Sequence, residues 1–183
     1  GPSFPTSTDI PDAPGTGPFG PEPVPGNGRD SIDGGRGNDL IYGEDDDDTL
    51  IGGLGADTLD GGIDDDLLQG GVGQDDMIGG QGADTMEGGD DRDFFIINER
   101  EDAFGDVVDG GTGGNDVDRL TLTGLGRFEI VGETTDADGD STSGTVNFLD
   151  DLGNIEGSLT FTEIERLVIC FTPGTAIATP RGE

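Results

Sequence analysis

The stretch that decides the fold runs from Pro25 to Ile96 and reads PGNGRDSID, GGRGNDLIY, GEDDDDTLI, GGLGADTLD, GGIDDDLLQ, GGVGQDDMI, GGQGADTME and GGDDRDFFI. These are eight consecutive nine-residue repeats, with no residue inserted or lost between them. Their sixth position is always aspartate: Asp30, Asp39, Asp48, Asp57, Asp66, Asp75, Asp84 and Asp93. Their eighth position is always large and apolar: Ile32, Ile41, Leu50, Leu59, Leu68, Met77, Met86 and Phe95. Such a fixed short period is typical of a solenoid that stacks identical turns.

Each part of the repeat has a physical role. The glycines permit positive φ, so the chain can turn tightly and direct its carbonyls inward. Aspartate supplies a charged oxygen on a short stem, and the triplet around the apolar residue predicts a short strand whose middle side chain points inward. Two repeats then form one turn, so aspartates eighteen residues apart stack in two columns. We therefore predict an all-β fold with a parallel β-roll over residues 26–97.

Composition indicates which ions such columns would bind. The chain has 41 acidic residues against 8 basic ones, all arginine, and a formal charge of −33 with 30% apolar residues. A chain so acidic and so poor in apolar residues stays disordered unless cations neutralise its carboxylates. The absence of histidine and the single cysteine disfavour a soft transition metal, whereas oxygen donors favour Ca²⁺ or Mg²⁺. The same charge repels nucleic acid, and no apolar run reaches the ~18 residues that span a bilayer.

The repeat resembles the G-G-x-G-x-D-x-U-x signature of the repeat-in-toxin (RTX, hemolysin-type) family, which binds calcium. The resemblance implies several Ca²⁺ ions between stacked loops, each held by aspartates from two successive turns and by backbone carbonyls. The implied metal-site residues are the eight aspartates above and the glycines of the four fully matching repeats: Gly34, Gly35, Gly37, Gly52, Gly53, Gly55, Gly70, Gly71, Gly73, Gly79, Gly80 and Gly82. Glu44 and Asp46 replace glycines, so we expect that loop to be the most strained and its ion the first lost.

The predicted roll has a thin core, with one large side chain for every nine residues. Burial on this scale cannot offset backbone ordering at about 1–2 kcal/mol per residue. Ion binding has to supply the difference, so we expect folding and calcium binding to be one event.

The flanks of the array differ from it. Residues 1–25 hold eight of the ten prolines and are interpreted as a linker. The apolar run from Phe94 to Ile97 is expected to close the open end of the roll. Residues 98–118 read as a degenerate continuation or capping region, in which Asp106, Asp109 and Asp116 could hold one further ion. A plain acidic loop remains an equal alternative for this segment.

From Arg119 the period changes to short apolar or alternating segments at 119–123, 127–133, 144–149, 157–162 and 165–171. They predict a small antiparallel β region over residues 119–169. The sequence leaves open whether this region packs on the roll or forms a separate domain.

The chain ends CFTPGTAIATPRGE, residues 170–183, which resembles the first block of Hint domains, the self-splicing fold of inteins and hedgehog proteins. Bacterial proteins that join calcium repeats to a Hint domain form a family similar to this arrangement. The resemblance implies that the Cys170 thiol attacks the carbonyl of Ile169 to form a thioester. That chemistry needs a histidine, and the chain has none. We therefore expect Cys170 to be catalytic only in a full Hint domain and to be an unreactive thiol in this truncated start.

These observations predict a secreted or cell-surface calcium-binding module without enzyme activity of its own. One alternative is part of an autoprocessing precursor cleaved or spliced at Cys170. Another is a subunit of an extracellular calcium-dependent fibre or surface layer. Calcium ions are the expected partners, without nucleic acid or membrane insertion, and self-association is left open.

Overall fold

A computed structural model describes residues 28–113, 117–136 and 141–170. The predicted proline-rich linker, Asp116 and the Hint-like residues after Cys170 lie outside these described ranges. The nonapeptide region forms eight strands: β1 (Ser31–Arg36), β2 (Leu40–Asp45), β3 (Thr49–Leu54), β4 (Thr58–Ile63), β5 (Leu67–Val72), β6 (Asp76–Gln81), β7 (Thr85–Asp90) and β8 (Phe94–Ile97). Each repeat therefore contributes one strand.

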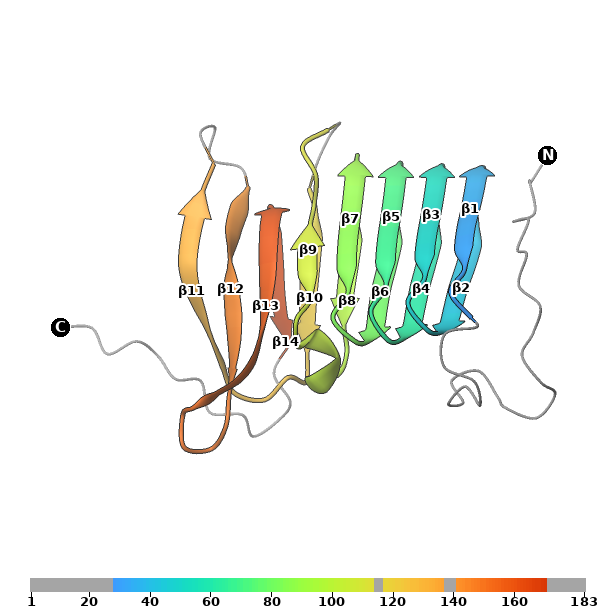
Figure 1. Cartoon of the computed structure of the whole chain (residues 1–183). Helices are drawn as coiled ribbons and strands as arrows, with labels where there is room; N and C mark the ends of the chain where they lie inside the picture. Colours follow the sequence, from blue (N-terminus) through green and yellow to red (C-terminus); the bar gives the residue numbers. More distant parts are fainter. Residues whose placement is uncertain (1–27, 114–116, 137–140, 171–183) are drawn as a thin grey trace.

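Successive strands alternate between two facing sheets. The odd-numbered strands of the array lie in an eight-stranded sheet ordered β1-β3-β5-β7-β9-β13-β12-β11, which also contains β9 (Val107–Asp109), β11 (Phe128–Thr135), β12 (Thr142–Leu149) and β13 (Ile155–Ile164). The even-numbered strands lie in a six-stranded sheet ordered β14-β10-β8-β6-β4-β2, which also contains β10 (Arg119–Thr123) and β14 (Arg166–Cys170) (Figure 1). Strands eighteen residues apart pair in parallel, as in Ser31 with Thr49 and Thr49 with Leu67. The predicted parallel β-roll is thus confirmed.

The eighth position of every repeat points between the two sheets. Its eight side chains, from Ile32 to Phe95, are all 0–4% exposed and belong to one contiguous core. Because side chains alternate along a strand, the neighbouring positions face outward. The period-two pattern around each apolar residue therefore places a single file of large side chains along the axis of the roll.

The strands are longer than the predicted triplets, because they continue through the first glycines of the next repeat. In β3, Gly53 has φ +106°, and a Cβ there would stand 2.5 Å from the carbonyl oxygen of Gly35 in the preceding coil. Glycine is needed here both for its backbone conformation and for the close approach of the coils. Residues other than glycine take positive φ in the repeats at Glu44, Asp46, Asp64 and Asp91. Two of these lie in one loop, the loop expected to be the most strained.

The roll continues beyond the array. After a short 3₁₀ helix, η1 (Glu101–Ala103), strand β9 (Val107–Asp109) pairs in parallel with β7, and β10 (Arg119–Thr123) pairs in parallel with β8. Strand β8 is therefore an internal strand, and the expectation that Phe94–Ile97 closes the end of the roll was wrong. The apolar run fits an internal position because Phe95 continues the file of inward side chains.

The remaining strands are β11 (Phe128–Thr135), β12 (Thr142–Leu149), β13 (Ile155–Ile164) and β14 (Arg166–Cys170). The predicted small antiparallel region consists of β11, β12 and β13, with Val146, Phe148, Leu159 and Phe161 in the same core as the roll. The expectation of antiparallel pairing fails for the strands at 119–123 and 166–170, which pair in parallel with each other. Their apolar alternation is the same in either kind of sheet, so the sequence could not separate the two.

Candidate metal centre

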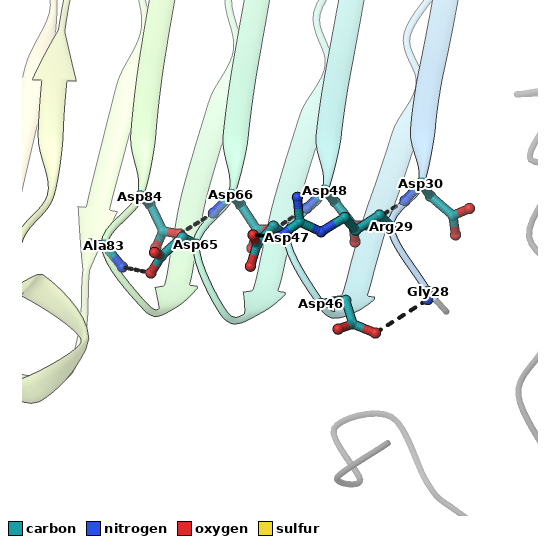
Figure 2. Close-up of polar contacts among 10 residues, drawn as sticks. All are labelled: Gly28, Arg29, Asp30, Asp46, Asp47, Asp48, Asp65, Asp66, Ala83 and Asp84. Atoms are coloured by element: carbon teal, nitrogen blue, oxygen red, sulfur yellow. Dashed lines mark hydrogen bonds and ion pairs between the residues drawn. The ribbon is translucent and has the colours of Figure 1, made fainter. Parts of the chain in front are cut away.

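Aspartates eighteen residues apart are joined by hydrogen bonds along each loop edge of the roll. In the first column Asp30 N–H donates to Asp48 Oδ1 (2.7 Å), Asp48 N–H to Asp66 Oδ1 (2.8 Å) and Asp66 N–H to Asp84 Oδ1 (2.9 Å) (Figure 2). The second column repeats this pattern from Asp39 through Asp57 and Asp75 to Asp93, at 2.8–2.9 Å. Each carboxylate is therefore fixed by the backbone of the preceding coil.

The strand that follows each aspartate fixes its backbone as well. Thr49 N–H donates to the carbonyl of Asp30, and Leu67 N–H donates to the carbonyl of Asp48, both at 2.9 Å. The parallel ladder thus begins at the aspartate itself, which explains why the side chain has the same orientation in every coil. The short aspartate stem lets Oδ1 reach the adjacent coil while Oδ2 stays in the space between coils.

The second oxygen of each carboxylate, Oδ2, is the strongest indication of a cation-binding site. The Oδ2 atoms of Asp39, Asp48, Asp57, Asp66, Asp75 and Asp84 are buried and accept no hydrogen bond. These residues are only 0–6% exposed. Burying an ionised carboxylate without a partner is strongly unfavourable, and a cation bound to Oδ2 removes that penalty.

Backbone oxygens converge on the same places. A Cβ built on Gly52 would meet Asp57 Oδ2 at 2.6 Å and the Gly70 carbonyl oxygen at 2.7 Å. The corresponding contacts at Gly70 are Asp75 Oδ2 at 2.6 Å and the Gly88 carbonyl oxygen at 2.7 Å. The first glycine of the repeat therefore leaves open a cradle edged by a carboxylate of its own coil and a carbonyl of the next. Hard oxygen donors of this kind suit Ca²⁺, which takes 6–8 of them at 2.3–2.6 Å.

The same burial raises the pKa values of aspartates in both columns. Burial raises the pKa of Asp66 to about 8 and that of Asp48 to about 7, and neighbouring aspartates add to both shifts. The pKa values of Asp75 and Asp84 rise to about 6 for the same leading reason, against the opposing effect of the backbone hydrogen bond that each accepts. A divalent cation between the coils would favour the ionised forms that burial disfavours.

Side chains alone do not complete a site. Within residues 28–113, 117–136 and 141–170, no group of three or more His, Cys, Asp or Glu side chains is placed to hold a metal ion. Backbone carbonyls would therefore have to supply much of the coordination. The residues present fit calcium on this basis, with the columnar aspartates as the charged ligands and loop carbonyls as the neutral ones.

The structure brings the twelve predicted glycines to the loop edges beside these columns. Those at the second and fourth repeat positions have positive φ: Gly35, Gly37, Gly53, Gly55, Gly71, Gly73, Gly80 and Gly82. The first-position glycines of the same repeats, Gly34, Gly52, Gly70 and Gly79, face Asp39, Asp57, Asp75 and Asp84 respectively. Asp30 is half-buried at the end of its column, next to an exposed ion pair between Arg29 and Asp47.

Two further predicted residues lie elsewhere. Asp109 follows the inward Val108 in β9, faces outward and accepts a hydrogen bond from Gly111 N–H at 3.3 Å. Cys170 ends β14 in register with Thr123.

Asp118 was not predicted, yet its Oδ1 accepts a hydrogen bond from Asp93 N–H at 2.7 Å. The sequence Asp118-Arg119-Leu120 has the aspartate-x-apolar order of the repeats, and this order was the signal that could have identified it.

Comparison with known families agrees with this geometry. A family model describing four copies of the RTX calcium-binding nonapeptide repeat matches residues 25–59 and again residues 60–95. This segment therefore carries RTX calcium-binding repeats, and its β-roll is a calcium-binding module. No curated protein and no solved structure matches the chain. No helix in the described part of the chain is long and apolar enough to cross a membrane.

Proposed function

We propose that this chain is an extracellular or cell-surface module that folds when it binds several calcium ions and that has no enzyme activity itself. The observation that carries the proposal is the row of buried Oδ2 atoms, which accept no hydrogen bond and recur at eighteen-residue intervals beside open glycine cradles. A repeated, preformed set of oxygen donors is a feature of cation binding, whereas a catalytic centre needs a single constellation of acid, base or nucleophile.

The coupling of folding to binding follows from charge. The chain carries a formal charge of −33, and many carboxylates are stacked in the columns and in neighbouring loop positions. Without cations their mutual repulsion and desolvation oppose folding. Each bound divalent ion neutralises charge in the folded state alone, so the ions stabilise the roll by mass action.

In an exported protein, the coupling of folding to calcium binding would delay folding until the chain is outside the cell. Calcium is scarce in the cytosol and reaches millimolar concentrations outside cells, where extracellular calcium modules bind with dissociation constants of about 10⁻⁴–10⁻³ M. The chain would stay unfolded before export and fold afterwards. The resemblance of residues 170–183 to a Hint domain remains a prediction, because all but Cys170 lie outside the described ranges.

A calcium titration of the full chain tests the proposal. Far-ultraviolet circular dichroism is expected to show little β structure in a chelator and a cooperative gain of β signal as free calcium rises. Calorimetry in parallel is expected to count several ions. Identical spectra in chelator and in millimolar calcium would refute the coupling of folding to binding, and the absence of calorimetric uptake would refute calcium binding itself.

A further inference from the structure

The aspartate columns extend past the last nonapeptide. Asp84 N–H donates to Asp106 Oδ1 at 3.0 Å, the same contact that links the aspartates inside the array. The two residues are separated by 22 positions, because η1 and its flanking residues replace the nine-residue spacing on this side of the coil. Asp106 therefore occupies a ladder position in a coil that the family match, which ends at residue 95, does not include.

Asp106 is held as rigidly as the aspartates of the array. Val107 N–H donates to the Asp84 carbonyl at 2.8 Å, and Thr160 N–H donates to the Asp106 carbonyl at 2.9 Å. The side chain is 1% exposed, and its Oδ2 is buried without a hydrogen-bond partner. Asp84 beside it is fully buried, and its Oδ2 also lacks a partner. The fourth and fifth coils thus each hold one fixed carboxylate with a buried oxygen that accepts no hydrogen bond.

A third carboxylate comes from outside the ladder. Helix η1 lies at the edge of the roll where the loops join β2 to β3, β4 to β5 and β6 to β7 (Figure 1). Asp102 lies within this helix, is half-buried and stands four residues before Asp106 in the sequence. The adjacent arginine, Arg100, forms an ion pair with Glu156 at 2.5 Å. The local negative charge is therefore greater here than at a loop with one aspartate per coil.

We propose that Asp84 and Asp106 hold an additional Ca²⁺ ion at the end of the nonapeptide array. Asp84 and Asp106 would bind the ion with their Oδ2 atoms, backbone carbonyls and water would complete the oxygen shell, and Asp102 would add negative charge. The inference rests on the proposed function, because it extends the same ladder. It goes further by placing an ion where the motif is absent and where the roll meets the C-terminal sheet.

Such a site links the two parts of the chain. Asp106 hydrogen-bonds to coil four through its side chain and to β13 through its carbonyl. Gly105 N–H also donates to the Ser158 carbonyl at 2.9 Å. An ion on Asp106 would therefore stabilise the joint between the array and the β11–β13 sheet, so ordering of that sheet would follow calcium as well.

The test compares Asp106→Asn with Glu87→Gln in the full chain. Each change removes one negative charge from one of the two coils beside the proposed ion, but Glu87 is exposed on the outer face of β7. Native mass spectrometry and calorimetry with Ca²⁺ alone are expected to count one ion fewer for Asp106→Asn and an unchanged number for Glu87→Gln. An undiminished count for Asp106→Asn would overturn the additional site while leaving calcium binding by the array intact. Absence of uptake by the unmodified chain would instead refute the proposed function together with the additional site.

A second variant covers the case in which Asp106→Asn does not fold, which circular dichroism in saturating calcium would reveal. Asp102 lies on η1, outside the ladder, so Asp102→Asn leaves the backbone contacts of the coils in place. We expect this variant to keep the full ion count while one site weakens about tenfold in calcium affinity. An affinity profile identical to that of the unmodified chain would overturn the proposal.

Discussion

The carboxylate of Asp66 accepts a hydrogen bond from Asp48 N–H at 2.8 Å through one oxygen and presents its other oxygen, buried and without a partner, to the space between coils. These separate roles of the two oxygens couple the fold to the ion. Oδ1 fixes the carboxylate through the neighbouring coil, and Oδ2 is thereby preorganised for a cation. Preorganisation lowers the cost of binding, because the ligand has no further freedom to lose.

Replacing Asp66 with asparagine separates these two roles. In Asp66→Asn the side-chain amide would keep an oxygen for Asp48 N–H but would lose the negative charge. The hydrogen bond between the coils is therefore retained, while calcium binding is weakened. We expect about a tenfold or larger loss of calcium affinity at the adjacent sites, equivalent to about 1.4 kcal/mol or more. Asp33→Asn, on the exposed face of β1, is the matched control and should leave affinity unchanged. Calorimetric titration of both variants checks the prediction, and equal affinities would contradict the role of Asp66 as a ligand.

The glycine cradle can be closed by a single methyl group. A Cβ on Gly52 would lie 2.6 Å from Asp57 Oδ2 and 2.7 Å from the Gly70 carbonyl oxygen, too close for either to stay in place. We expect Gly52→Ala to destabilise the calcium-loaded roll by about 1–3 kcal/mol, as overpacking does in protein cores, and to lower its calcium affinity. Thermal unfolding at fixed calcium measures the first effect and titration measures the second.

Gly153→Ala provides the control for backbone strain alone. Gly153 has φ +88°, yet a Cβ there meets nothing within 4 Å. This variant should lose some stability through its left-handed backbone and need only correspondingly more calcium to fold, while it still binds the full number of ions. If Gly52→Ala behaved in the same way, the cradle would not be an ion site.

The sequence predicted the part of the fold in which one residue type recurs at a fixed interval. The aspartates from Asp30 to Asp93 and the apolar residues from Ile32 to Phe95 each keep the nine-residue period. The aspartate columns and the row of inward-pointing apolar side chains could therefore be predicted from the repeat period alone. The period is lost where Asp106 lies 22 residues after Asp84 and Asp118 lies 25 after Asp93. Which residue stacks on which is decided there by parallel pairing of β9 with β7 and β10 with β8. That pairing is a tertiary contact, and no local pattern specifies it.

Acidity should act on the ion-free and calcium-loaded chains in opposite directions. The folded pKa values of Asp48 and Asp66 rise to about 7 and about 8, above the ordinary value of 3.8 expected in the unfolded chain. The ion-free roll therefore binds more protons than the unfolded chain between about pH 4 and pH 8. The stability that these two carboxyl groups contribute to the ion-free roll is fully present below about pH 4 and is lost as pH rises through their folded pKa values. Circular dichroism in chelator should accordingly show more β structure at pH 5 than at pH 8.

Protons and calcium compete for the same carboxylates, so calcium affinity should rise from pH 6 to pH 8 and level off above that range. Calcium binding at pH 6.5 should release protons. Calorimetry in two buffers of different ionisation enthalpy measures this release directly. A calcium affinity independent of pH across this range would show that the buried aspartates stay ionised without the ion.

The thin core should make calcium affinity depend on a residue that touches no ion. Leu68 is fully buried in the middle of the apolar file, and truncating such a side chain to alanine costs about 2–5 kcal/mol. Because folding and binding form one equilibrium, that cost must be met by a higher calcium concentration at the folding midpoint. Leu40→Ala, on a side chain 52% exposed on the outer face of β2, should leave the midpoint nearly unchanged. Titration followed by circular dichroism compares the two variants. An unshifted midpoint for Leu68→Ala would mean that the ion sites form without the packed roll, and folding and binding would then be separate events.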